Sequence, residues 1–220
     1  MAQNYLVTSW KAMLQMIVNL CGKGYYYYHL TELPINKQNK WGKIDSKIIQ
    51  KYQTDKSKWQ RQRQKRNGIA NFYYLRWEHI FVVLRTEGTI FASIMYDDKF
   101  SDIRKSPISL KITSLTTFKI QFFKQKKITV YLSGDTYKGL KDNLYDVAKT
   151  KNISKIKQAF NQLNGYPAYQ GILEQKNQLA TFLILQSKKH NCRLKRNELR
   201  FHTQKRTLKN YYEAEEESSL

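Results

Sequence analysis

The spacing of apolar residues along the chain changes near residue 133, and this change limits the possible folds more than any other feature. Before it, short runs rich in β-branched and aromatic residues alternate with turn residues, notably at 69–77, 80–86, 108–112, 118–123 and 128–132. Such runs are typical of antiparallel strands. After it, apolar residues recur every three to four positions, which indicates helices. We therefore predict an α+β fold: an antiparallel sheet with a basic helical insertion, followed by a helical C-terminal part.

The same patterns predict individual elements at both ends of the chain. An apolar face over residues 10–21, preceded by the capping residues Thr8 and Ser9, predicts a helix. The four tyrosines that follow predict a strand, which Pro34 ends. In the C-terminal part, Asp135 is expected to cap the first helix, and two more are expected over 153–163 and 168–190.

The basic helical insertion spans residues 44–66. Residues 36–43 are expected to form a polar loop before it. Asp45 is a candidate cap for a first short helix over 46–52, and a second helix is expected over 56–66. We expect Trp59 to be the apolar anchor of this second helix.

The predicted boundaries divide the chain into a sheet domain over 1–133, a helical region over 134–210 and a disordered acidic tail over 211–220. No run of eighteen apolar residues and no signal peptide is recognisable, so we expect a cytoplasmic protein without a transmembrane segment. Cys21 and Cys192 lie far apart in sequence, which favours free thiols over a disulfide or a zinc site.

The charge balance gives the strongest indication of function. The chain has 39 Lys and Arg against 17 Asp and Glu, a formal net charge of +22. Such an excess destabilises a compact fold through self-repulsion, and it suits a protein whose partner is a polyanion. We expect DNA or RNA as the partner, together with other proteins of a nucleoprotein complex. An anionic membrane surface and an acidic protein are the alternatives.

Two basic regions and one further arginine are the candidate nucleic-acid contacts. Phosphate backbones require several cations along one track, and Arg can hold a phosphate through two hydrogen bonds. The candidates in the insertion and the following strand are Lys56, Lys58, Arg61, Arg63, Lys65, Arg66 and Arg76. Those near the C-terminus are Lys188, Lys189, Arg193, Lys195, Arg196, Arg200, Lys205 and Arg206.

Aromatic residues concentrate in two predicted strands, at residues 25–28 and at Phe72, Tyr73, Tyr74 and Trp77. Bases can stack on exposed aromatic rings, at about 1–3 kcal/mol per base. Because side chains of a strand alternate between two faces, only half of these rings can lie on one side, and core packing is the main expectation for them.

A metal-dependent nuclease is the alternative function. His29, Glu78 and His79 are candidate ligands for Mg²⁺ or Mn²⁺, and Tyr137 with Lys141 nearby is a candidate nucleophile. The order of sheet and tyrosine-bearing helix resembles rolling-circle replication and transposition nucleases, but their His-hydrophobic-His motif is absent. Without this activity, no cofactor is expected. Asp97, Asp98 and Asp102 could hold Mg²⁺, but an ordinary loop is the preferred interpretation.

Overall fold

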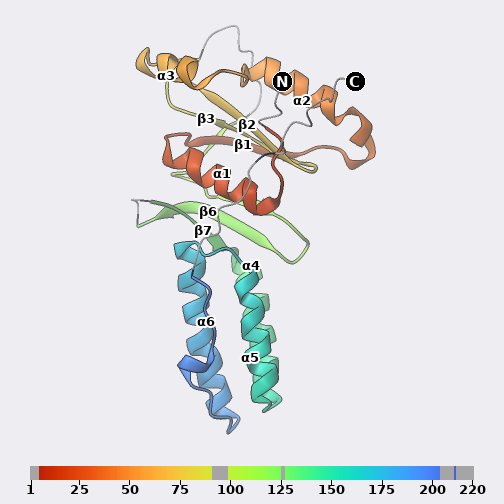
Figure 1. The fold of residues 1–220 in the computed structure, drawn as a ribbon, viewed down its shortest axis with the longest axis vertical. Helices are drawn as coiled ribbons and strands as arrows, with labels where there is room; N and C mark the ends of the chain where they lie inside the picture. Colours follow the sequence, from red (N-terminus) through yellow and green to blue (C-terminus); the bar gives the residue numbers. More distant parts are fainter. Residues whose placement is uncertain (1–4, 91–98, 125–126, 204–210, 212–220) are drawn as a thin grey trace, which may run out of the picture. The chain divides into compact units, whose positions relative to one another are not determined.

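A computed structural model of the 220-residue chain describes residues 5–90, 99–124, 127–203 and Tyr211 (Figure 1). Of the described residues, 48% are helical and 22% lie in strands, and the strands pair antiparallel, which confirms the α+β class. The chain divides into two compact units, unit 1 (residues 1–108 and 208–220) and unit 2 (residues 109–207). The division thus lies before the boundary at residue 133 that the change of apolar period suggests.

Unit 1 contains a four-stranded sheet in the order β2-β3-β1-β4. Tyr27 of β1 and Phe72 of β2 both lie opposite Arg85 of β3, so β3 lies between β1 and β2. Along the chain, the elements are α1 (Trp10–Gly22), β1 (Tyr27–Glu32), η1 (Ile35–Lys40), α2 (Trp41–Tyr52), α3 (Lys58–Arg66), β2 (Phe72–Trp77), β3 (Ile80–Arg85) and β4 (Ser101–Asp102). The strands predicted at 69–77 and 80–86 are confirmed and pair as a hairpin, and the predicted first helix is confirmed with Ser9 as its cap.

Helices α1 and α2 cover opposite faces of this sheet (Figure 1). Phe72 and Tyr74 of β2, with Phe81 and Val83 of β3, form a buried cluster that includes the apolar side of α2. The buried side of α1 carries an apolar stripe, as its sequence predicts: Ala12, Met13, Leu14, Ile17, Leu20 and Cys21. The strand alternation therefore places apolar residues on both faces, as a sheet between two helices requires.

Asp45 does not cap a helix, and residues 36–43 are not a loop, so both sequence predictions are wrong. Residues 35–40 form a 3₁₀ helix and α2 begins at Trp41, which places Asp45 one turn inside it. Its carboxylate is fully buried and accepts hydrogen bonds from Tyr74 Oη at 2.6 Å and from Arg76 Nε and Nη2 at 2.9 and 2.8 Å. A buried carboxylate needs such partners, and this need outweighs its preference for a helix start.

Unit 2 combines a three-stranded sheet in the order β5-β6-β7 with three long helices. Its elements are β5 (Ile108–Lys111), β6 (Thr117–Phe123), β7 (Lys127–Leu132), α4 (Gly134–Lys149), α5 (Ile153–Gln162), η2 (Leu163–Gly165), α6 (Gln170–Lys189) and η3 (Arg196–Glu198). The three helices match their predicted positions. The cap of α4 is Ser133, whose Oγ accepts from Thr136 N at 3.2 Å, and not Asp135, which lies in the first turn.

Two contacts explain why the second sheet belongs with the helices. Gln175 of α6 donates to the carbonyl of Leu132 at the end of β7 and accepts from its amide, at 3.0 and 2.8 Å. At Gly171, an added Cβ would lie 2.6 Å from the carbonyl oxygen of Val130, so only glycine allows α6 to approach β7 this closely. The sheet and the helices therefore pack as one body.

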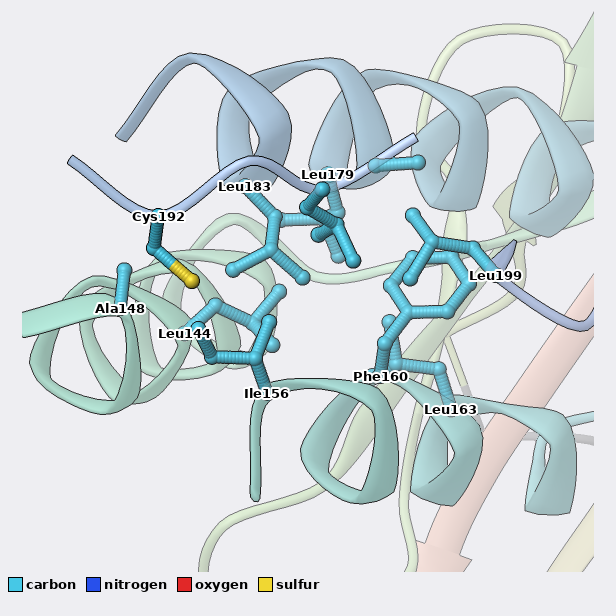
Figure 2. Close-up of a cluster of buried hydrophobic side chains, with 11 residues drawn as sticks. Leu144, Ala148, Ile156, Phe160, Leu163, Leu179, Leu183, Cys192 and Leu199 are labelled. Carbon is cyan, nitrogen blue, oxygen red and sulfur yellow. The ribbon is translucent and has the colours of Figure 1, made fainter. Parts of the chain in front are cut away.

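The helices of unit 2 enclose an apolar core to which the C-terminal segment contributes (Figure 2). Leu144, Ile156, Phe160 and Leu183 come from the three helices, and all are almost fully buried. Cys192, Leu194 and Leu199 follow α6 and pack against the same cluster. The segment after α6 is therefore fixed to the helices by its apolar residues.

Three further predictions concern the cysteines, membrane-spanning helices and the C-terminal tail. Cys21 and Cys192 are buried free thiols, and burial raises the pKa of Cys21 to about 12. No helix among the described residues is long and apolar enough to cross a membrane. Tyr211, assigned to the tail by its sequence, forms an antiparallel bridge with Val7, and its Oη lies 2.7 Å from Tyr73 Oη. The acidic residues 213–217 lie outside the described residues.

Asp45→Asn should destabilise unit 1 by about 3–5 kcal/mol, because it leaves the guanidinium of Arg76 buried without a countercharge. Urea unfolding followed by circular dichroism measures the effect. The double variant Asp45→Asn/Arg76→Met should recover part of the lost stability. Asp146→Asn is the control, because its pair with Lys149 is exposed and should contribute less than about 1 kcal/mol. Equal losses in both single variants would contradict the anchoring role of Asp45.

Lys176 lies on the buried side of α6 and is 1% exposed. Among the described residues, its Nζ has no hydrogen-bond partner. Burial therefore lowers the pKa of Lys176 to about 8, because the charged form loses its hydration without a compensating contact. An unpaired buried ammonium opposes folding at neutral pH.

Lys176→Met should raise the free energy of unfolding at pH 7 by about 1–3 kcal/mol. The folded-state pKa lies below the ordinary value of 10.5, so the penalty is complete below about pH 8 and declines as the pH rises towards 10.5. The stability difference between variant and parent should therefore narrow between pH 7 and pH 10, in urea unfolding at each pH. A difference that does not change with pH would contradict the buried charge.

Candidate nucleic-acid interface

Helix α3 is a short basic helix with a well-defined start. Ser57 caps it, with Ser57 N donating to Gln60 Oε1 at 2.7 Å and Ser57 Oγ accepting from Gln60 N at 3.3 Å. This reciprocal cap satisfies two backbone donors that a helix start otherwise leaves without partners. The helix carries five basic residues and no acidic residue.

Arg61 attaches the inner side of α3 to the rest of unit 1. Its Nη2 donates to the carbonyl of Thr54 at 2.7 Å, and its guanidinium lies 4.7 Å from the ring centre of Tyr73 on β2. The carbonyl of Arg61 accepts from Asn71 Nδ2 at 3.1 Å. Arg61, a predicted phosphate contact, is therefore half-buried and positions the helix.

The outer side of α3 carries Trp59, Arg63 and Arg66, which lie on one face by their i, i+4 and i+7 spacing. Trp59 is 78% exposed, so the prediction that it anchors the helix is wrong. The physical reason is visible in the sequence, because the positions three and four residues after Trp59 are Gln62 and Arg63, and no apolar stripe can form. Arg61, at the opposite side of the helix, makes the attachment instead.

The remaining predicted contacts of unit 1 differ in accessibility. Lys58 and Lys65 are exposed at the flank of α3. Lys56, before the helix, is half-buried, and burial lowers its pKa. Arg76 is 9% exposed and its donors are used by Asp45 and by the carbonyl of Glu78, so it belongs to the core and not to a binding surface.

The second basic region begins in the last turn of α6 in unit 2 and continues after it. Lys188, Lys189, Arg193, Lys195 and Arg200 are all exposed. Arg196 is also exposed, but its guanidinium donates to Asn177 and lies 4.3 Å from the ring centre of Phe201. Lys205 and Arg206 lie outside the described residues. The apolar residues between these cations, Leu194 and Leu199, fix the segment to the core of unit 2.

Several carboxylates of the described residues bind cations that are not among the candidate contacts. Glu198 binds Lys157 Nζ and the amide of Lys195, both at 2.7 Å. Arg104 of unit 1 binds Asp102 and Glu87, at 2.7 and 2.6 Å. Within the described ranges, no ion pair involves Lys58, Lys65 or the arginines on the outer face of α3. The same holds for the side chains of Lys188, Lys189, Arg193, Lys195 and Arg200.

The aromatic residues of the strands serve mainly in packing. Tyr25, Phe72 and Tyr74 are buried. Tyr73 is half-buried between the guanidinium of Arg61 and the edge of Tyr25. Residues 26–28 are half-buried as well, and one of them, Tyr27, lies 4.2 Å from the guanidinium of Arg85. Arg85 is not among the contacts predicted from the sequence.

The candidate metal ligands do not gather. His29 lies opposite Val83, whereas His79 lies at the hairpin turn, where its carbonyl accepts from Leu33 N. At about 3.3 Å per residue, the two histidines are separated by about 13 Å along the strands. Glu78 is exposed at the turn. No group of three or more His, Cys, Asp or Glu in the described part of the chain could hold a metal ion.

Asp102, from the acidic alternative, is the last residue of β4 and not part of a loop, and both of its carboxylate oxygens accept hydrogen bonds from Arg104. Asp97 and Asp98 lie outside the described residues.

In the described part of unit 2, the proposed nucleophile has no activating partner. Tyr137 Oη donates to Gln178 Oε1 at 3.3 Å, and burial raises the pKa of Tyr137, which disfavours the phenolate. Lys141 directs its ammonium to the ring of Phe182, 4.7 Å from its centre. The two residues therefore form no nucleophile and base pair.

No protein-family model, curated protein or solved structure matches this chain. Function must therefore be inferred from the residues themselves. Trp59 is the residue whose role the sequence interpretation missed, although the absence of apolar neighbours at helical spacing was the signal that could have revealed it.

Proposed function

We propose that this protein binds DNA or RNA by gripping the phosphate backbone through two basic regions, one in each unit. The observation that carries the proposal is the set of exposed cations on α3 and in residues 188–200 that have no carboxylate partner among the described residues.

Unpaired surface cations are the chemistry that a polyanion recognises. Each phosphate neutralised by Lys or Arg releases condensed counterions, and this release drives binding at moderate salt. Arg63 and Arg66 can in addition each hold a phosphate through two hydrogen bonds, which Lys cannot do. On a chain of net charge +22, bound phosphates would also relieve the self-repulsion of the folded state.

A membrane surface fits α3 less well. A helix that lies on a membrane needs an apolar face opposite its polar face. On α3, the only apolar side chain is Trp59, and it shares its face with Arg63 and Arg66. An acidic protein partner would use the same cations. The salt dependence of nucleic-acid binding, described below, distinguishes the two kinds of partner.

The proposal extends to a role as an accessory component of a larger nucleoprotein assembly. Two compact units that each carry a basic region can contact separate stretches of nucleic acid. The candidate catalytic residues form no assembled site, which favours binding over cleavage. The nuclease alternative therefore gains no support from the geometry.

Binding to a labelled 30-mer should depend steeply on salt, as measured by fluorescence anisotropy. If about six phosphates are neutralised, the log–log slope of affinity against salt concentration on duplex DNA should be about −5. Replacing Lys58, Arg63, Lys65 and Arg66 with Gln should make this slope shallower by about 2–3, because about half of the six phosphate contacts are lost. The same is expected for Gln at Lys188, Lys189, Arg193 and Lys195.

A matched control keeps the same change of charge but moves it elsewhere. Lys111, Lys119, Lys138 and Lys155 are exposed lysines outside both regions, and their replacement by Gln should change the slope by less than about 1. An equal effect of this control would show that net charge alone drives binding. Failure of the parent protein to bind any strand at low salt would overturn the proposal.

A further inference from the structure

We propose that the outer face of α3 is a single-strand binding site, on which one base stacks against Trp59 while Arg63 and Arg66 hold neighbouring phosphates. The inference rests on the proposed function and deepens it, because it names the class of nucleic acid. It follows from the exposure of Trp59, the residues that share its face, and the way α3 is held.

The exposure of Trp59 sets it apart from the other tryptophans of the chain. Trp10, Trp41 and Trp77 are half-buried, whereas Trp59 is 78% exposed. Trp41 donates its indole N–H to the carbonyl of Pro34, and the guanidinium of Arg76 lies over its ring. Trp59 has no comparable contact with the described residues. A large apolar ring left in water is a candidate binding surface, since its burial is favourable in any apolar contact.

The face of α3 that carries Trp59 is cationic, and the helix itself contains no carboxylate. Arg63 and Arg66 follow it by one and two turns, about 6 and 10 Å further along the helix axis. Gln62 is also exposed on this side and can bond to sugar or base edges. An aromatic ring beside a track of cations is the combination with which proteins bind single strands.

The helix that carries this face is held in place from behind. The cap at Ser57, the contacts of Arg61 with Thr54 and Tyr73, and the bond from Asn71 fix its orientation. Just after the C-terminal end of α3, the backbone of Gly68 and Ala70 lies against Gly88, which has a φ of +127°. A fixed platform loses little conformational entropy when a base binds to it.

Geometry favours a single strand over a duplex. In a duplex, the faces of the bases are stacked on one another and are not available to a protruding ring. In a single strand, bases can turn outwards and stack on an aromatic side chain regardless of sequence. The site should therefore prefer unpaired strands of either DNA or RNA, with little sequence preference.

Trp59→Ala should weaken binding of a thymidine 12-mer and of a uridine 12-mer by about tenfold, because one stacking contact is lost. Binding of a 12-base-pair duplex should change less than twofold. Trp59→Phe should keep most of the affinity. Anisotropy measures the affinities, and the quenching of tryptophan fluorescence by the 12-mers should fall in Trp59→Phe. The two 12-mers show whether DNA or RNA is preferred.

Leu115→Ala is the matched control, because Leu115 is 82% exposed but lies in unit 2 outside both basic regions. It should leave all affinities unchanged. Equal losses on single strands and duplex in Trp59→Ala, or no loss on either, would overturn the stacking site while the proposed function stands. Absence of binding by the parent protein would overturn both. If Trp59→Ala loses binding to phosphatidylserine vesicles but keeps single-strand binding, Trp59 makes a membrane contact and the inference is overturned.

Discussion

The buried pair of Asp45 and Arg76 is the interaction on which unit 1 depends. It joins the inner side of α2 to β2, and Tyr74 completes the set of donors around the carboxylate. In a chain with 39 basic and 17 acidic residues, one of the few carboxylates is thus used inside the protein, where its burial requires full satisfaction by donors. The carboxylate also raises the pKa of Tyr74, after burial itself, so this phenol remains a donor.

The position of the basic surface follows from this pair through short connections. Once α2 is fixed on the sheet, it ends at Tyr52, and the next residue, Gln53, has a left-handed conformation with a φ of +49°. The next residue, Thr54, offers its carbonyl to Arg61 of α3. Arg61 therefore holds the helix in place, and its stacking on Tyr73 connects α3 to β2. The cations on the other sides of α3 make no comparable contact with the described residues.

Much of the fold could be predicted from the sequence, and the failures share a physical cause. The strands of the hairpin, the three-stranded sheet and the C-terminal helices follow from the period of apolar residues, which reflects burial on one face. Asp45 was assigned to a cap and Arg76 to a binding surface because local rules treat a charge as solvent-exposed. Only the tertiary structure brings these opposite charges together across 31 positions. The sequence predicts Trp59 as the apolar anchor of its helix, because large apolar residues are usually buried.

The correction at Trp59 changes what the basic helix can recognise. Cations alone respond to the phosphate backbone, which is common to all nucleic acids, and their contribution weakens as salt rises. A stacked base contributes an apolar and dispersion term that salt affects little, and a paired duplex cannot supply that base. On α3 these two contributions come from one face, with Arg63 and Arg66 next to Trp59. Affinity would then come from charge, and the preference for single strands from the exposed ring.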